Sequence, residues 1–209
     1  MKRASAAPLR SDPRYLKAFG EIMSRIQESL RGRKKAVAVY VAGGAALHLY
    51  TGARFSGDID AHIEVNRYLV PDNLEVVYEG PDGRPRVLYF DTSYNESFAL
   101  LHEDVHRDSI PIDVPGVDRR ILDVRLFSPV DLAVSKLARF ETQDQEDIKA
   151  IALAGLMTAA QFRQRAEEAL AGYSGVVERV RSSLEIACKV LAKLPASRPT
   201  PSQPPRGRP

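Results

Sequence analysis

Apolar residues recur along the chain in two patterns, one typical of helices and one typical of strands. Helical spacing over residues 13–30 predicts a first helix, with Asp12 as its N-cap and Pro13 at its first position. A continuous apolar run over 36–42 predicts a buried strand. Alternation over 58–65 predicts a second strand whose two faces differ in polarity. The chain is therefore expected to begin with a helix and two strands.

Glycine residues mark the boundaries of the next predicted elements. Gly43 and Gly44 end the first strand, and a short helix over 45–50 stops near Gly52. Two strand-like runs within residues 74–94 flank the turn sequence PDGRP, which predicts a β-hairpin. These signals add a short helix and a hairpin to the first half of the chain.

The second half of the chain carries mostly helical patterns. Two short strands are predicted first, over 109–114 and 121–127. Ser128 and Pro129 suit the N-cap and first position of a helix whose apolar positions extend to Phe140. Further helices are expected over 143–153, 158–171 and 174–194. The elements together predict an α+β (α/β) fold, with a small mixed sheet flanked by helices and a C-terminal helical bundle.

Domain boundaries follow from the same patterns. Residues 13–127 are expected to form a domain built on the sheet, and residues 128–194 a helical region. The segments 1–12 and 195–209 are polar or rich in proline and arginine, and they carry few of the large apolar residues that a packed core needs. We therefore expect both ends to be disordered.

Composition narrows the class of protein without indicating a function. The 209 residues are 44% hydrophobic and 27% charged, as in ordinary soluble globular proteins. The chain has no apolar run of about eighteen residues, so we expect no membrane span. Its N-terminus does not resemble a secretory signal. The net charge of +3 permits a polyanionic partner but does not require one.

The single cysteine, Cys188, limits the chemistry further. It excludes an intramolecular disulfide and a cysteine-based zinc site, and it fits a reducing cytoplasm. Cys188 falls on the apolar stripe of the last predicted helix, so we expect it in the core.

The segment from Val39 to Glu64 carries the candidate chemistry. Asp58 and Asp60 are two residues apart on a predicted strand, so their carboxylates lie on the same face. Gly43 and Gly44 precede a helix, where the backbone can approach a phosphate closely. These features predict a site for a divalent cation and a nucleoside triphosphate; the alternative is a solvated acidic strand face.

Two motifs resemble a known family. The Gly43-Gly44 pair followed by Asp58-Ile59-Asp60 resembles the polymerase-β-like nucleotidyltransferase superfamily. The later stretch SPVDLAVSKLARFETQDQEDI is similar to the back half of the subgroup that includes abortive-infection type nucleotidyltransferase toxins. The resemblance covers roughly residues 37–148 and implies a nucleotidyltransferase-like sheet.

The resemblance also implies an activity and partners. It implies a Mg²⁺-dependent enzyme that transfers a nucleoside monophosphate from a nucleoside triphosphate to a hydroxyl group. The leading acceptor is an RNA such as tRNA, and the leading role is the toxin of a toxin–antitoxin pair, with a cognate antitoxin protein as partner. The alternative is a non-catalytic antitoxin or regulatory binding partner with the same fold.

The metal ligands that the resemblance implies are aspartates. Asp58 and Asp60 would bind Mg²⁺, and a third carboxylate would come from a later strand. Asp91, in the predicted hairpin, and Asp113 both match the required pattern, and Asp123 is a more distant candidate. The position of the hairpin favours Asp91.

The phosphate contacts are implied in the same way. The Gly43-Gly44 turn would hold the phosphates, and Ser56 would contact one of them. Lys136 would neutralise charge on the triphosphate, and Asp144 or Asp147 would orient the nucleophile or that lysine. Many members of the superfamily have Gly-Ser where this chain has Gly-Gly. This chain therefore lacks one hydroxyl ligand to phosphate, and contacts from backbone N–H groups are expected to be more important.

Single residues in this region have other interpretations. Lys136 would, on the alternative view, be a surface lysine that pairs with Glu141 or Asp131. His62, His102 and His106 raise the alternative of a zinc site. The pair His102 and His106 lacks a third ligand at motif spacing, and His62 shares the acidic face, so we expect no zinc there.

Overall fold

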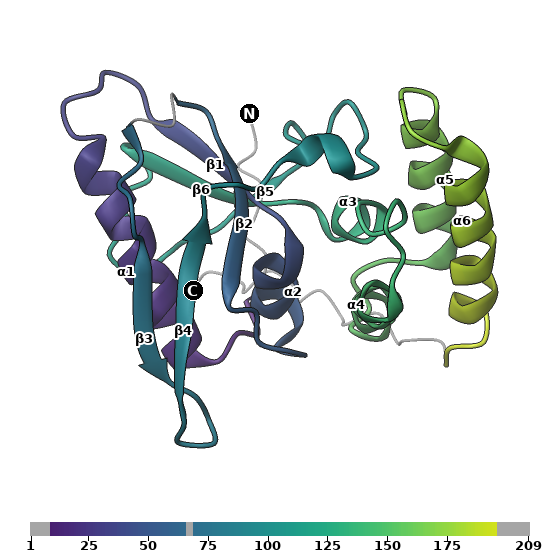
Figure 1. The fold of residues 1–209 in the computed structure, drawn as a ribbon, viewed down its shortest axis with the longest axis horizontal. Helices are drawn as coiled ribbons and strands as arrows, with labels where there is room; N and C mark the ends of the chain where they lie inside the picture. Colours follow the sequence, from purple (N-terminus) through teal and green to yellow (C-terminus); the bar gives the residue numbers. More distant parts are fainter. Residues whose placement is uncertain (1–8, 66–68, 196–209) are drawn as a thin grey trace, which may run out of the picture.

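The computed structural model describes residues 9–65 and 69–195, and six strands within these ranges form one sheet (Figure 1). The strands are Val37–Val41 (β1), Asp58–Ile63 (β2), Glu75–Glu79 (β3), Pro85–Asp91 (β4), Ile110–Pro111 (β5) and Leu122–Leu126 (β6). Their order in space is β3-β4-β2-β1-β6-β5. β1 is parallel to β6 and β2 is parallel to β4, whereas the other neighbouring pairs are antiparallel. The predicted mixed sheet is confirmed.

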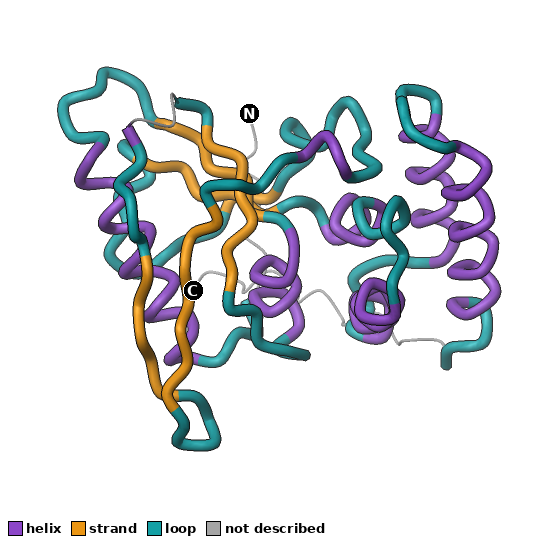
Figure 2. The backbone as a smooth tube through the Cα atoms, viewed as in Figure 1, coloured by secondary structure: helices purple, strands orange, loops and turns teal. Residues whose placement is uncertain are grey.

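The helices fall into two groups. α1 (Pro13–Ser29) packs against β3 and β4, and α2 (Gly43–Thr51) packs against β2. The others gather on the far side of α2, with α5 and α6 outermost, in Figures 1 and 2. They are α3 (Pro129–Val134), α4 (Thr142–Leu153), α5 (Ala159–Leu170) and α6 (Val177–Leu191). α2 thus lies between the sheet and the C-terminal helices.

Several helices begin where the capping signals predict. Asp12 is the N-cap of α1 and is followed by Pro13. Ser128 caps α3 through its side chain. Thr158 and Gln161 form a capping box at the start of α5. These polar side chains bind N–H groups that a helix end leaves unpaired, which explains why the signals locate the helices well.

The centre of the sheet is the core of the molecule. Val39 and Val41 on β1, Val124 and Leu126 on β6, and Ile59 on β2 have at most 1% of their surface exposed. β1 is covered on both faces, which is why its sequence is a continuous apolar run. Cys188 on α6 is 9% exposed and belongs to the same core, as predicted.

One predicted helix is shorter than its pattern indicates. α3 ends at Val134, although apolar positions continue at helical spacing to Phe140. Beyond Val134 the backbone makes tight turns, with the N–H of Lys136 bonded to the carbonyl of Ala133, and Phe140 has a φ of 55°. The turns allow the Lys136 side chain to meet α4, a contact that a periodicity argument does not include.

The two ends of the chain fall largely outside the described residues. The disorder predicted for 1–12 and 195–209 concerns mostly residues 1–8 and 196–209, which the structure does not describe. Within the described part, the N–H of Arg10 bonds to the carbonyl of Leu49 at 2.9 Å. None of the helices in the described ranges has the length and apolar character needed to cross a bilayer.

Candidate active site

Strand β2 places two aspartates on one face of the sheet. Ile59 and Ala61 are buried on the opposite face, so Asp58 and Asp60 point together into partly open space. β2 and β4 run in parallel, with Asp60 paired to Asp91 in the register. Directly paired residues of neighbouring strands share a face, so Asp91 lies on the same face of the sheet as Asp58 and Asp60.

The carboxylates of this acidic group repel one another. Burial, together with the charges of Asp58 and Asp91, raises the pKa of Asp60 to about 6. Lys136 and Arg139 act in the opposite direction. A positive ion at this place would therefore relieve repulsion that the protein itself only partly offsets.

The other two candidate acids lie elsewhere. Asp113 follows β5, its side chain is 78% exposed, and it pairs with Arg119 at 3.4 Å. Asp123 lies on β6 and pairs with Arg119 and Arg125. The sheet therefore brings Asp91 to Asp60 and does not bring Asp113 or Asp123 there.

The glycine turn lies directly against the acids. Gly43 is the first residue of α2 and has a φ of 57°. A Cβ atom at Gly43 would overlap the Asp60 carboxylate, and one at Gly44 would overlap the Ser56 hydroxyl. No side chain of the described residues caps α2, whose N-cap is Ala42. The N-terminus of α2 therefore offers backbone N–H donors beside the carboxylates.

Ser56 contacts an aspartate instead of open space. Its side chain is buried, and Oγ donates a hydrogen bond to Asp58 Oδ1 at 2.5 Å. This bond fixes the orientation of the Asp58 carboxylate. The predicted contact of Ser56 with a phosphate stays a prediction.

A buried ion network faces the acids from the helices. Lys136 Nζ lies 2.7 Å from Asp147 Oδ2 and 3.8 Å from Asp144 Oδ1, and its side chain is 6% exposed. The interpretation of Lys136 as a surface lysine paired with Glu141 or Asp131 is therefore wrong. Both aspartates are almost fully buried on α4, so they hold Lys136 in place.

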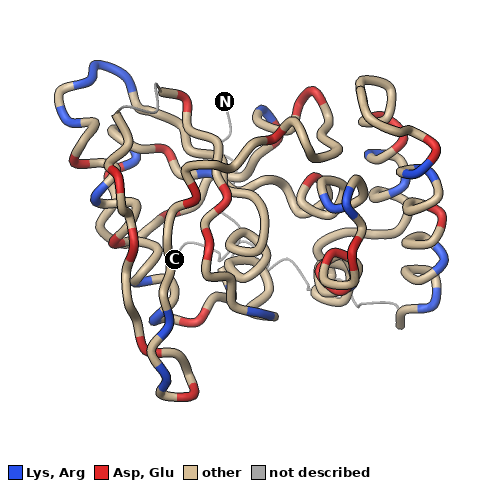
Figure 3. The backbone as a smooth tube through the Cα atoms, viewed as in Figure 1, with Lys and Arg blue, Asp and Glu red and all other residues tan. Residues whose placement is uncertain are grey.

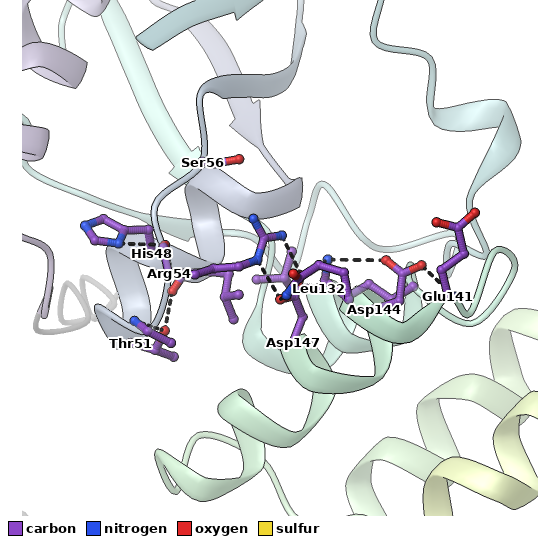
Figure 4. Close-up of polar contacts among 12 residues, drawn as sticks. His48, Thr51, Arg54, Ser56, Leu132, Glu141, Asp144 and Asp147 are labelled. Carbon is purple, nitrogen blue, oxygen red and sulfur yellow. Dashed lines mark hydrogen bonds and ion pairs between the residues drawn. The ribbon is translucent and has the colours of Figure 1, made fainter. Parts of the chain in front are cut away.

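Two arginines complete this network. Arg54, from the segment between α2 and β2, binds Asp147 through Nε and Nη2, each at 2.8 Å (Figure 4). Arg139 binds Asp144 with the same two-pronged geometry, also at 2.8 Å. Charge-assisted pairs of this form are strong and directional. Glu141 lies 4.0 Å from Arg139 Nε, so three carboxylates balance the three cations of this network.

Sequence reasoning gave neither arginine a role. Arg139 lies within the Lys-Leu segment and could have been proposed from it. Arg54 carries no signal, because its partner Asp147 is 93 positions away in the chain.

His48 supports the position of Arg54. Its Nδ1 lies 2.8 Å from the Arg54 carbonyl, and its Nε2 accepts the N–H of Asp12 at 3.2 Å. These partners require a neutral ring that donates from Nδ1. Burial lowers the pKa of His48, which favours the same form.

Asp60 and the ion network line one cleft. Its empty volume, including the part open to solvent, is ≈ 630 Å³. Its walls combine the glycine turn, one acid, the ion network and the segment after β4. The lining residues are Gly43, Asp60, Tyr94, Asn95, Phe98, Ala99, Ser135, Lys136, Arg139 and Asp144.

Comparison with protein families agrees with this geometry. Residues 17–193 match the model of a family described as "Nucleotidyltransferase of unknown function (DUF6036)". The chain belongs to this family. The match runs from α1 to just beyond α6, so the C-terminal helices of this nucleotidyltransferase are part of the family unit. A comparison with curated proteins found no match.

The residues of the nucleotidyltransferase fit the chemistry of Mg²⁺. No three His, Cys, Asp or Glu side chains of the described residues are gathered closely enough to hold a metal ion by themselves. Magnesium is commonly bound by one or two carboxylates together with substrate phosphates and water. Asp58 and Asp60, next to the open glycine turn, provide such a partial set.

The three histidines considered as zinc ligands do not lie together in the nucleotidyltransferase. His62 and His106 stack with ring centroids 5.0 Å apart, and Glu96 lies 2.9 Å from His106 Nε2. His102 lies instead near Asp104 and Glu168. Glu96 and His106 therefore connect the segment after β4 to a later part of the chain.

Proposed function

We propose that this nucleotidyltransferase moves a nucleoside monophosphate from a nucleoside triphosphate to a hydroxyl group. The hydroxyl oxygen forms a bond to the α-phosphorus, and the bond from that phosphorus to the bridging oxygen breaks. Pyrophosphate leaves, and the hydroxyl proton passes to a carboxylate or to water. The observation that carries the proposal is that Asp60 and Lys136, of opposite charge, line one cleft beside an uncapped helix N-terminus.

The acidic residues of the cleft would bind the cation, and its N–H donors and basic residues would bind the triphosphate. Asp58 and Asp60 would hold Mg²⁺, with Asp91 as the adjacent carboxylate. Magnesium, when bound, neutralises charge on phosphate oxygens. Backbone N–H groups at Gly43 and the cationic side chains of Lys136 and Arg139, which line the cleft, favour the triphosphate at the same place. Positioning and electrostatic stabilisation are what transfer of this kind requires.

The acceptor class rests on the resemblance. We propose RNA, such as tRNA, and a toxin role within a toxin–antitoxin pair. The basic run at residues 31–35 does not add support, because Figure 3 shows it at the end of the molecule away from α3 and α4. A non-catalytic binding role on the same fold is opposed by the shared face of Asp58, Asp60 and Asp91, because such a protein does not need this acidic face.

A labelling assay tests the activity. The protein is incubated with Mg²⁺, total RNA and each nucleoside triphosphate labelled at the α-phosphate, and label in RNA is measured. We expect Asp60→Asn to reduce transfer by roughly 100-fold or more, because it removes several kcal/mol of charge stabilisation. Asp113→Asn is the matched control at an exposed aspartate and should retain transfer.

Each outcome has a distinct meaning. Equal transfer by the unaltered protein and by Asp60→Asn would show that Asp60 is not part of the active site. Transfer to protein instead of RNA would retain the enzyme and replace the acceptor. Stable binding of a partner protein without transfer under any condition would favour the non-catalytic role.

A further inference from the structure

Phe98 is the most exposed large apolar residue in the part of the chain that the structure describes. It lies in the short 3-10 helix Glu96–Phe98, and 81% of its surface is open to solvent. Phe98 also lines the cleft that contains Asp60 and Lys136. Because Phe98 is both exposed and part of the lining of a charged cleft, its ring is available to a ligand that has an apolar part.

The segment that carries Phe98 is anchored on both sides. Leu100 is fully buried two residues later. Glu96 lies 2.9 Å from His106 Nε2, and the side chain of Asn95 accepts the N–H of Ser97 at 2.9 Å. Phe98 is therefore exposed although the segment that carries it is fixed by these contacts.

The other residues that line the cleft restrict the identity of the ligand. Lys136 and Arg139 place positive charge there, and the glycine turn adds backbone N–H donors. A ligand that suits these groups and Phe98 has a polyanionic part and a flat apolar part. A nucleoside triphosphate has both, because its base has a π-face and its phosphates carry the charge.

We propose that Phe98 is the surface on which the base of the nucleoside triphosphate stacks. This inference rests on the proposed function and adds a residue that positions the nucleotide. Stacking on an aromatic ring tolerates every base, since each has a π-face. The site is therefore expected to accept all four nucleotides, with purines held more tightly because they offer a larger surface.

Binding measurements with two ligands test the proposal. Affinities for ATP and for inorganic tripolyphosphate are measured by calorimetry with Mg²⁺ present. Phe98→Ala should weaken ATP binding by roughly 5- to 150-fold and leave tripolyphosphate binding unchanged, because only ATP has a base. Phe98→Trp should retain ATP binding. Ile186→Ala, at a half-exposed residue of α6, is the control for loss of surface apolar area.

The possible outcomes separate this proposal from the proposed function. Equal ATP affinity of Phe98→Ala and the unaltered protein would overturn the stacking role alone. Equal weakening of both ligands would assign Phe98 to the architecture of the cleft and overturn it as well. Unchanged ATP affinity with reduced transfer to RNA would place Phe98 on the acceptor. If the unaltered protein bound neither ligand, the proposed function itself would fail.

Discussion

Gly43 is the residue at which the N-terminus of α2 meets the acidic face of β2. Its φ of 57° lies in the left-handed region, and its missing Cβ leaves the space that the Asp60 carboxylate occupies. The glycine thus has two functions, one in the backbone and one in packing. A sequence motif records only that glycine is present.

Substitution can separate these two functions. Gly43→Ala should lower nucleotidyl transfer at least about tenfold, because the new methyl group displaces Asp60, in addition to a strain cost of roughly 1–2 kcal/mol. Gly83→Ala is the matched control: its φ is 73°, and a Cβ there meets nothing within 4 Å. We expect Gly83→Ala to show the strain cost in urea unfolding and no loss of transfer. Equal losses of transfer would contradict the packing role of Gly43.

At the scale of elements, α4 connects the sheet domain to the C-terminal helices. Asp147 accepts bonds from Arg54, Lys136 and Gln143, at 2.7 to 3.0 Å. One carboxylate therefore fixes the segment before β2 and the turn after α3. The ion network positions Lys136 and also holds two parts of the chain together.

This predicts a large stability effect on one face of α4. Asp147→Asn should destabilise the protein by about 3–5 kcal/mol, because it removes the carboxylate nearest to the buried Lys136 and the ion-pair partner of Arg54. Glu146→Gln, at the preceding residue, breaks an exposed pair with Lys149 and should change stability by less than about 1 kcal/mol. Urea unfolding measures both. A small effect of Asp147→Asn would show that Asp144 alone sustains the network.

For the whole molecule, the ionised Asp60 carboxylate lowers the free energy of unfolding at neutral pH. Folding raises the pKa of Asp60 from 3.8 to about 6, so the folded state binds this proton more tightly than the unfolded chain. The contribution of Asp60 to stability therefore falls as the pH rises from 3.8 to 6, and it is least favourable above 6.

A pH series of thermal midpoints tests this sign. Asp60→Asn should be more stable than the unaltered protein at pH 7.5, and the difference should shrink as the pH falls below 6 towards 3.8. Taking the difference removes the opposite contribution of His48, whose lowered pKa costs stability as the pH falls below 6.5. Added Mg²⁺ should raise the midpoint of the unaltered protein more than that of Asp60→Asn. A pH-independent difference would contradict the electrostatic account.

Local signals explain the parts of the fold that the sequence predicts well. Asp12, Ser128 and Thr158 cap helices because their side chains bind N–H groups a few residues away. The hairpin of β3 and β4 follows from its turn sequence. The end of α3 was mispredicted, since the Lys136 contacts with α4 compete with the helical pattern there.

The sequence by itself determined that Asp58 and Asp60 share a face, because the period of a strand is local. It also determined that the glycine pair lies where a strand gives way to a helix, although α2 begins at Gly43 itself and not at residue 45. Only the tertiary structure decided that Asp91 and not Asp113 lies beside Asp60, since strand order is a long-range property. It likewise decided that Arg54 binds Asp147 and that Phe98 borders the cleft. These contacts join segments far apart in the chain, and no periodicity or spacing encodes which distant segments meet.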